Sequence, residues 1–278
     1  MIDPRQLLAM EPIRTRHVFS KRDCMLYALG IGATGLPYVY EERLRAFPTM
    51  AVVLAHAGFF WRDPRFGADW KRLLAGGQSV EIHRPLPVEG EFIGLTRFEA
   101  VDDKGPGKGA IVHYSRSIET SDGALVAVDR RTVVLRGDGG CGSAGGPIAR
   151  PEGVDTGRTP DAEIELPTHC NQALIYRLSG DDNPLHVDPA MAKASGFDRP
   201  ILHGLCTYGV ACRALADALC DGDATPIRRM DARFTGIVYP GDTIITRIWR
   251  SGTGQAAFDA IVKERGVSVL GGGRVEFS

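Results

Sequence analysis

The 278-residue sequence predicts an α+β fold made of two copies of one unit, each a long helix covered by an antiparallel β-sheet. Three observations carry this prediction. Short segments of the first half recur in the second half about 150 residues later. In each half, strand-like segments with short connections follow a helix-like run. A stretch rich in glycine and proline separates the two halves, as expected of a boundary.

The helix of each unit is expected where a proline opens an apolar run. Pro48 precedes the run 49–60 in the first half, and Pro200 precedes the run 201–219 in the second. Proline suits the first turn of a helix, because its missing N–H has no helical partner there. The matched segments of the two halves are 47–48 with 199–200, 87–91 with 238–242, and 27–30 with 176–179.

The strands of each unit are expected after the helical run, where Val, Ile, Thr and aromatic residues recur and Gly or Asp-Gly marks the joins. The joins are too short for helical crossovers, so neighbouring strands should run antiparallel. The expected strands are 79–84, 91–100, 109–120 and 124–135 in the first half, and 230–234, 243–250, 255–263 and 267–277 in the second.

The domain organisation follows from one segment of unusual composition. Residues 137–146 are dense in glycine, and prolines with few bulky apolar residues follow them. Such a segment buries too little apolar surface to offset the entropy lost on ordering it. We therefore expect a first repeat at 1–136, a linker over the surface at 137–162, and a second repeat at 163–278.

The composition argues against several classes of protein. The 33 Lys and Arg residues are balanced by 34 Asp and Glu, whereas nucleic-acid-binding proteins usually show a basic excess. The longest apolar stretch, 50–61, is shorter than the roughly 20 residues of a membrane-spanning helix. The start shows no secretory signal, and the end is no peroxisomal Ser-Lys-Leu tail. The six cysteines form no Cys-x-x-Cys pair, which favours reduced thiols and a cytoplasmic protein.

Reactive side chains crowd into one loop-like segment of the second half, and three hypotheses fit them. Asp181, Asn183 and Asp188 could simply cap turns, with His186 and His203 as structural polar residues. A second hypothesis is an iron site of two histidines and one carboxylate, from His186, Asp188 and His203. The third is acid/base chemistry, with Asp181 and His186 converging on one water or one substrate proton.

The same segment resembles a known family. Residues 176–189 resemble the hydratase 2 motif of MaoC-like (R)-specific enoyl-CoA hydratases, and residues 200–206 resemble the entrance of that family's central helix. Residues 27–33 and 47–49 resemble the first half of two-repeat members. The resemblance implies a double hot-dog fold, in which an antiparallel sheet wraps a long helix, twice. It also implies reversible hydration of a trans-2-enoyl-CoA to the (R)-3-hydroxyacyl-CoA, with no metal or organic cofactor.

The resemblance also assigns roles to individual residues. It implies that Asp181 and His186 are catalytic, that Asn183 holds the loop and helps to place the substrate or the dyad, and that the Gly204 N–H faces the thioester oxygen. Candidate substrate-binding residues are Ser179, Gly180 and His203 near the motif, and Arg228 and Arg233, which by charge alone suit the CoA phosphates.

The implied chemistry needs groups of these types. The β-carbon of an enoyl thioester is electrophilic, but water at neutral pH is a poor nucleophile, so a base must take its proton. Returning that proton to the α-carbon from the same side gives syn addition. The developing enolate needs a preorganised donor, which an unpaired N–H in the first turn of a helix supplies.

The duplication predicts one active site per chain. The positions that match Asp181 and His186 in the first half are Gly32 and Pro37, which carry out no acid/base chemistry. The first repeat is therefore expected to be inert and to shape an acyl pocket, with simple core packing as the alternative explanation of the small residues at 49–58.

Several functions remain open at this point. The chain could dehydrate another acyl thioester, on acyl-carrier protein or with a branched, steroid or dicarboxylic acyl group. It could instead be a hot-dog thioesterase or a non-catalytic acyl-binding protein, because a fold alone does not decide function. The expected partners are an acyl-CoA substrate and a second copy of the chain in a homodimer, with no nucleic acid and no membrane.

Overall fold

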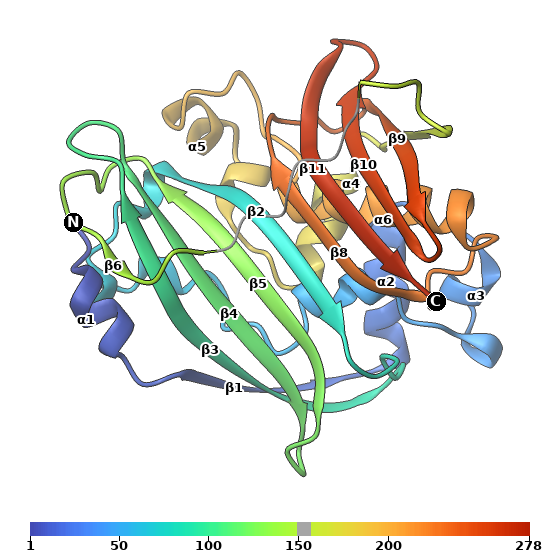
Figure 1. Ribbon diagram of the computed structural model, residues 1–278, viewed down its shortest axis with the longest axis horizontal. Helices are drawn as coiled ribbons and strands as arrows, with labels where there is room; N and C mark the ends of the chain where they lie inside the picture. The colour runs from blue at the N-terminus through green and yellow to red at the C-terminus, as the bar shows by residue number, and fades with distance from the viewer. Residues whose placement is uncertain (149–156) are drawn as a thin grey trace.

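The computed structural model describes residues 1–148 and 157–278, and within them one 11-stranded antiparallel sheet runs through both halves (Figure 1). The strands of the first half are β1 (Ile13–Phe19), β2 (Leu73–Ile82), β3 (Gly90–Asp103), β4 (Ala110–Thr120) and β5 (Leu125–Leu135), and a short β6 (Ala144–Gly145) pairs with β3. The strands of the second half are β7 (Ala162–Pro167), β8 (Ile227–Phe234), β9 (Thr243–Gly252), β10 (Gln255–Val262) and β11 (Val267–Phe277).

The order of the strands confirms the duplication. It reads β1-β3-β4-β5-β2 and then β8-β11-β10-β9-β7, so the second half repeats the first in reverse. The two halves join where β2 pairs antiparallel with β8, and Ser79 lies opposite Asp231. All eight predicted strands are present, and two further strands, β1 and β7, form the two edges.

The helices lie on one face of this sheet (Figure 1). The α-helices are α1 (Pro4–Ala9), α2 (Lys21–Gly30), α3 (Leu36–Val39), α4 (Gln172–Tyr176), α5 (Pro189–Ala194) and α6 (Gly204–Leu219). Single 3₁₀ turns are η1 (Glu41–Arg43), η2 (Pro48–Val52), η3 (Phe60–Arg62), η4 (Pro64–Phe66), η5 (Trp70–Arg72), η6 (Arg177–Ser179) and η7 (Pro184–His186). In the described residues no helix is long and apolar enough to cross a membrane.

Helix α6 is the central helix of the second repeat, as the sequence predicts. It is buried on nearly all sides and contacts β7, β8 and β9, whose inward side chains are apolar. It begins at Gly204, three residues later than the predicted start at residue 201. The reason is that the Leu202 N–H donates to the Val238 carbonyl (2.7 Å), which keeps this stretch extended, and His203 takes the N-cap position.

The predicted central helix of the first repeat, residues 49–60, is wrong. Only the 3₁₀ turn η2 forms there, and the chain then leaves helical geometry at Ala55 (φ 50°) and Gly58 (φ 68°). A left-handed alanine is strained and cannot belong to a right-handed helix. The long helix wrapped by a sheet is therefore present once in the described chain, in the second repeat.

A buried polar cluster explains why this helix does not form. Arg116 is 1% exposed and donates through Nη2 to the carbonyls of Ala51 (3.0 Å) and Val52 (2.9 Å), while it pairs with Asp129 (2.7 Å). Arg131 also donates to the Val52 carbonyl. In a continuous α-helix these carbonyls would accept from N–H groups four residues later. A buried guanidinium must be hydrogen-bonded, so the two arginines donate to these carbonyls. The carbonyls then do not accept from helical N–H groups, and the helix ends.

The backbone beyond η2 is held by strand β1. The Thr15 hydroxyl donates to the Ala55 carbonyl (2.9 Å), and the Ala55 N–H donates to His17 Nδ1 (2.9 Å). This carbonyl lies so close to β3 that a Cβ at Gly94 would be 2.3 Å from the Ala55 oxygen. The segment that replaces the helix is thus fixed in place by side chains from β1, β4 and β5.

The predicted linker, 137–162, is partly corrected. Asp138 is fully buried and accepts from the backbone N–H groups of Ile2 (3.1 Å) and Asp69 (3.0 Å), so the first part of the segment is packed against the first repeat. Strand β6 attaches it further to β3. Residues 149–156 of the predicted linker lie outside the described residues.

The close approach of Ala55 to β3 makes Gly94 a sensitive position. Gly94→Ala should lower the free energy of unfolding by about 1–3 kcal/mol, because the added Cβ meets the backbone oxygen of Ala55, a residue that hydrogen bonds to Thr15 and His17 hold in place. Urea unfolding followed by tryptophan fluorescence measures this change. Gly35→Ala, whose Cβ meets only atoms at 3.9 Å, is the matched control. Equal stability of the two variants would contradict the described packing.

Candidate active site

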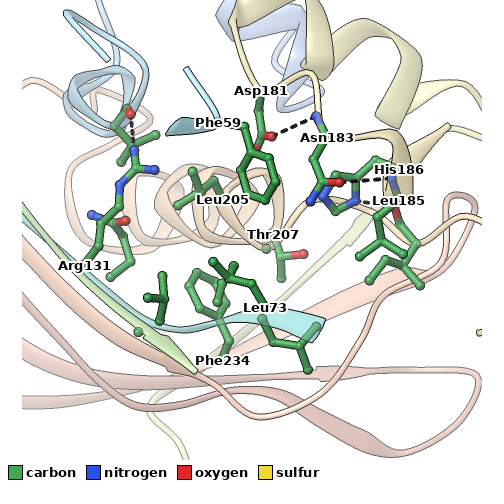
Figure 2. A pocket seen from close by; sticks show the side chains of 18 of the residues that line it. Phe59, Leu73, Arg131, Asp181, Asn183, Leu185, His186, Leu205, Thr207 and Phe234 are labelled. Atoms are coloured by element: carbon green, nitrogen blue, oxygen red, sulfur yellow. Dashed lines mark hydrogen bonds between the residues drawn. The ribbon is translucent and has the colours of Figure 1, made fainter. Parts of the chain in front are cut away.

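A cavity of about 290 Å³ lies between the two repeats, and residues of both line it (Figure 2). The second repeat contributes Asp181, His186 and Gly204, together with apolar residues of α6 and β8. The first repeat contributes Arg131 of β5 and the segment after η2, including Phe59. The cavity therefore extends into the volume that a central helix would fill in the first repeat.

The loop before the dyad turns sharply, which brings Asp181 and His186 to this cavity. Turn η6 ends at Gly180, whose φ of 110° is readily adopted by glycine alone. Asn183 then caps η7, its side chain accepting from the Leu185 N–H (3.2 Å), and Pro184 takes the first position of that turn. The five-residue spacing is thus folded back on itself, and side-chain atoms of Asp181 and His186 lie within 4.8 Å of each other.

His186 is held in one orientation and one tautomer. The residue is 9% exposed, and Nδ1 lies 2.9 Å from the Ile201 carbonyl, which can only accept. Nδ1 therefore carries the proton, and Nε2 is left with a free lone pair. Burial lowers the pKa of His186, so the ring is neutral at pH 7 and Nε2 can accept a proton.

The Asp181 side chain is ionised at neutral pH. Burial on its own raises the pKa of Asp181, but the nearby side chains of His203, His186 and Arg131 outweigh it, so that the pKa lies below its usual value. The Asn183 N–H is also oriented toward Oδ1, at 3.5 Å. The cavity therefore presents two proton acceptors side by side, one carboxylate oxygen and one imidazole nitrogen.

His203 contacts both Asp181 and His186 on the side away from the cavity. It is fully buried, does not line the cavity, and stacks on His186 with ring centroids 3.7 Å apart. Its Nε2 donates to the Asp181 carbonyl (3.2 Å), and burial lowers its pKa to about 3. The geometry thus puts His203 out of reach of a ligand in this cavity and makes it a support for both catalytic candidates.

The structure does not assemble the iron site considered above. Asp188 is exposed and caps α5 by accepting from the Ala190 N–H (2.8 Å). Asp181 is closer to the two histidines, but their rings stack at an interplanar angle of 27°. The lone pairs of an imidazole lie in the ring plane, so two stacked rings cannot both direct one at a single ion at about 2 Å. This arrangement does not suit a metal.

Gly204 offers a donor on the same cavity. It is the first residue of α6, and no acceptor for its N–H is found among residues 1–148 and 157–278. Three features meet here: an unpaired N–H, the positive end of the helix dipole, and a residue without Cβ. A Cβ would lie 3.1 Å from the Phe234 ring, so glycine also allows this ring to pack against the helix start.

Of the remaining predicted site residues, some line the cavity and others do not. Gly180 and Asn183 line the cavity, whereas the Ser179 hydroxyl is buried with no hydrogen-bond partner in the described structure. Arg228 and Arg233 do not line it. Arg233 is exposed and lies against Gly272, on the opposite face of β8 from Phe234, which does line the cavity.

Sequence reasoning missed the contribution of the first repeat to this cavity. Arg131 and His56 line it, and neither matched the motif. One signal could have found Arg131. In a strand that alternates inward and outward residues, the run Asp129-Arg130-Arg131 must direct at least one charge toward the core.

Comparison with known proteins identifies the family. Residues 153–272 match the model of the MaoC like domain, and residues 17–137 match that of the MFE-2 hydratase 2 N-terminal domain. The chain is 45% identical to "3-hydroxyacyl-thioester dehydratase Y" of Mycobacterium tuberculosis, over 92% of this chain and 90% of that protein. The chain belongs to the MaoC-like dehydratase family. It is an enzyme, a hydro-lyase.

Two further relatives agree with this assignment. "Enoyl-CoA hydratase 2, peroxisomal" of Arabidopsis thaliana is 39% identical over 96% of this chain and 93% of that protein. The solved structure of a MaoC-like dehydratase from Phytophthora capsici superposes with a TM-score of 0.89 at 36% identity, covering 99% of this chain and 98% of that one. The double hot-dog fold expected from the sequence is confirmed.

The lowered pKa values of the dyad predict a pH profile. Both groups must be deprotonated to accept protons from water, and both have pKa values below their ordinary values of 3.8 for Asp181 and 6.5 for His186. A lowered pKa keeps the basic form present at lower pH. With an enoyl-CoA substrate, kcat/KM should stay constant as the pH falls to 6.5 and decline only below it. If initial rates instead gave an acid limb centred above pH 6.5, burial would not be what controls the pKa of His186.

Proposed function

We propose that this enzyme adds water reversibly to a trans-2-enoyl-CoA and forms the (R)-3-hydroxyacyl-CoA, using Asp181 and His186 as a dyad. The observation that carries the proposal is the placement of three groups on one cavity. A carboxylate oxygen of Asp181 and a ring nitrogen of His186 lie within 4.8 Å of each other, and a helix-start N–H at Gly204 is free to bind an oxyanion. Hydration of an enoyl thioester requires this combination.

The reaction follows from the roles of these groups. A water between Asp181 and His186 donates one hydrogen to the carboxylate and the other to Nε2, which leaves an oxygen lone pair directed at the β-carbon. As the new C–O bond forms, the π electrons move to the thioester oxygen, where the Gly204 N–H stabilises the negative charge. One of the two acceptors takes the proton and returns it to the α-carbon, so that all atoms of the water enter the product.

The stereochemistry has a geometric reason. Both acceptors lie on the same side of the cavity, so the hydroxyl and the proton reach the double bond from one face (Figure 2). Addition is then syn. The (R) configuration is the expectation that the hydratase 2 motif implies, and a coupled assay with an (R)-specific dehydrogenase tests it.

We further propose one active site per chain, with the first repeat serving as a wall of the acyl pocket. The first-repeat position that matches Asp181 is Gly32, and a Cβ there would meet the Arg213 guanidinium at 2.8 Å. Arg213 donates to the Ile31 carbonyl (2.9 Å), so this part of the surface is filled. The missing central helix leaves room beside Phe59, Phe60 and Trp61 for a long or bulky acyl chain.

Other thioester chemistry remains the alternative. The same geometry serves dehydration of an acyl group carried by acyl-carrier protein, or of a branched, steroid or dicarboxylic acyl-CoA. A thioesterase needs a nucleophile directed at the thioester carbon itself. We instead place the water between Asp181 and His186, on the same cavity as the Gly204 N–H that would hold the thioester oxygen, and this favours hydration.

Loss of either dyad member should abolish hydration. Asp181→Asn and His186→Ala are each expected to lower kcat/KM for crotonyl-CoA by about 10²–10⁴, because each removes one proton acceptor from the water. The assay follows loss of the conjugated-alkene absorbance together with release of free thiol. Circular dichroism should confirm that the variants remain folded.

The matched control is Asp188→Asn, the same chemical change at an exposed cap that asparagine can replace. It should retain the activity of the unmodified enzyme. Near-normal alkene loss in both dyad variants would refute the dyad, and thiol release by the unmodified enzyme would indicate a thioesterase.

A homodimer stays a proposal as well. Exposed leucines gather where α2, α4 and η6 contact one another: Leu29, Leu174 and Leu178 are 44%, 50% and 61% exposed. We place the dimer contact there and expect sedimentation to give twice the 30.0 kDa chain mass. Leu174→Glu with Leu178→Glu should give the monomer, and a monomeric unmodified protein would overturn the assignment. The cytoplasmic location stays a prediction.

A further inference from the structure

The acyl side of the cavity contains a polar group of residues that hydration does not use. Arg131, His56 and Gln78 all line the cavity and all come from the first repeat. We propose that these three residues form a subsite for an oxygen atom on the acyl chain, that of a hydroxyl or a carboxylate group beyond the reacting double bond. This inference rests on the proposed function, because it assumes that the cavity holds the acyl part of a thioester.

Arg131 retains unused donors at the cavity wall. Its Nε donates to Asp129 (3.0 Å), Nη1 faces His56 Nε2 (3.1 Å), and Nη2 donates to the Val52 carbonyl. A guanidinium carries five N–H groups, so two remain without a partner in the described structure. The side chain is 12% exposed, and it is one of the residues that line the cavity.

Within the cluster the charges do not balance. Arg116 and Arg131 both pair with the single carboxylate of Asp129, which leaves one positive charge in excess. The Asp181 carboxylate on the same cavity attracts Arg131 but makes no hydrogen bond to it in the described structure. A buried charge is costly unless an opposite charge or a hydrogen-bond acceptor faces it. An acyl group with an oxygen would supply that acceptor.

His56 adds a neutral donor. A guanidinium can only donate, so His56 Nε2 accepts from Arg131 and the ring proton must be on Nδ1. Burial and the two arginines lower the pKa of His56 well below its usual value, so the ring stays neutral. Among residues 1–148 and 157–278 no partner for this Nδ1–H is found, and the ring lines the cavity.

Gln78 adds an acceptor. It is 4% exposed, and its Nε2 donates to Asp129 and to the Ser79 carbonyl (3.0 Å), which fixes the orientation of the amide. Its Oε1 is then buried with no hydrogen-bond partner in the described structure. An unsatisfied buried oxygen in an otherwise well-packed wall is destabilising. Neighbouring atoms cover Oε1, so a small shift of the Gln78 amide is needed before a ligand hydroxyl satisfies it.

The position of this group fits the path of an acyl chain. Figure 2 shows Arg131 on the other side of the cavity from His186, with the apolar side chains of Phe59, Leu73 and Phe234 between them. A thioester held at Gly204 with its double bond at the dyad directs its chain along these apolar residues. The chain then ends at the polar group, so the subsite selects for acyl chains that carry an oxygen there.

Binding of saturated acyl-CoAs tests the subsite without requiring hydration. Isothermal titration should compare hexanoyl-, decanoyl- and dodecanoyl-CoA with the forms of each that carry a terminal hydroxyl or a terminal carboxylate. We expect one oxygenated series to bind about tenfold or more tightly than the plain series at the matching chain length. A preference for the carboxylate alone identifies the charge of Arg131 as the recognition element, and a preference for the hydroxyl identifies His56 and Gln78.

Two variants and a control connect this preference to the proposed residues. Arg131→Met and, with less change to the packing, His56→Phe should reduce the preference to threefold or less. Arg130→Met removes the same guanidinium one position away, on the opposite face of β5, where Arg130 pairs with Glu81. This control variant should keep the preference for the oxygenated acyl-CoA. No preference in the unmodified protein, or a preference that survives in both cavity variants, overturns the subsite. If the protein shows the binding preference but hydrates no enoyl-CoA, the subsite proposal stands and the proposed function is refuted.

Discussion

The buried ion pair between Arg116 and Asp129 is the constraint on which the rest of this structure depends. Both residues are 1% exposed, and the guanidinium donates to the carbonyls of Ala51 and Val52, which a helix would need as acceptors. Breaking such a pair by removing one partner typically costs about 3–5 kcal/mol, because the other charge stays buried. The pair therefore fixes a broken segment where the second repeat has a helix, and the open volume becomes part of the cavity.

The two repeats consequently divide the work of one site. In the proposed mechanism the second repeat supplies the water-activating groups, which lie between η6 and η7 and on η7, and the oxyanion donor at the start of α6. The first repeat supplies the wall, the polar group and, through the broken segment, the space. Each contribution depends on a local departure from the shared unit. In the second repeat it is the loop around Asn183, and in the first it is the buried charge on β4 and β5.

Most of the fold and the chemical end of the site could be predicted from the sequence, for identifiable reasons. Residue composition and turn residues predict the strands, and the loop from Gly180 to His186 contains a specific motif. The first-repeat helix could not be excluded, because residues 49–60 are apolar and Pro48 suits a helix start. The residues that prevent it, Arg116 and Asp129, lie in other strands and act only after the sheet has formed. The edge strands were missed because polar residues alternate along them.

The pairing of β2 with β8 has a consequence for the history of this chain. Two units that share one continuous sheet across a seam of equivalent residues have the geometry of a former symmetric dimer. In a dimer of identical subunits, any substitution changes both halves at once, so neither site can be given up without losing the other. Fusion into one polypeptide removed that coupling. One half is then free to lose its central helix and to carry buried arginines in its sheet, while the other half keeps the helix.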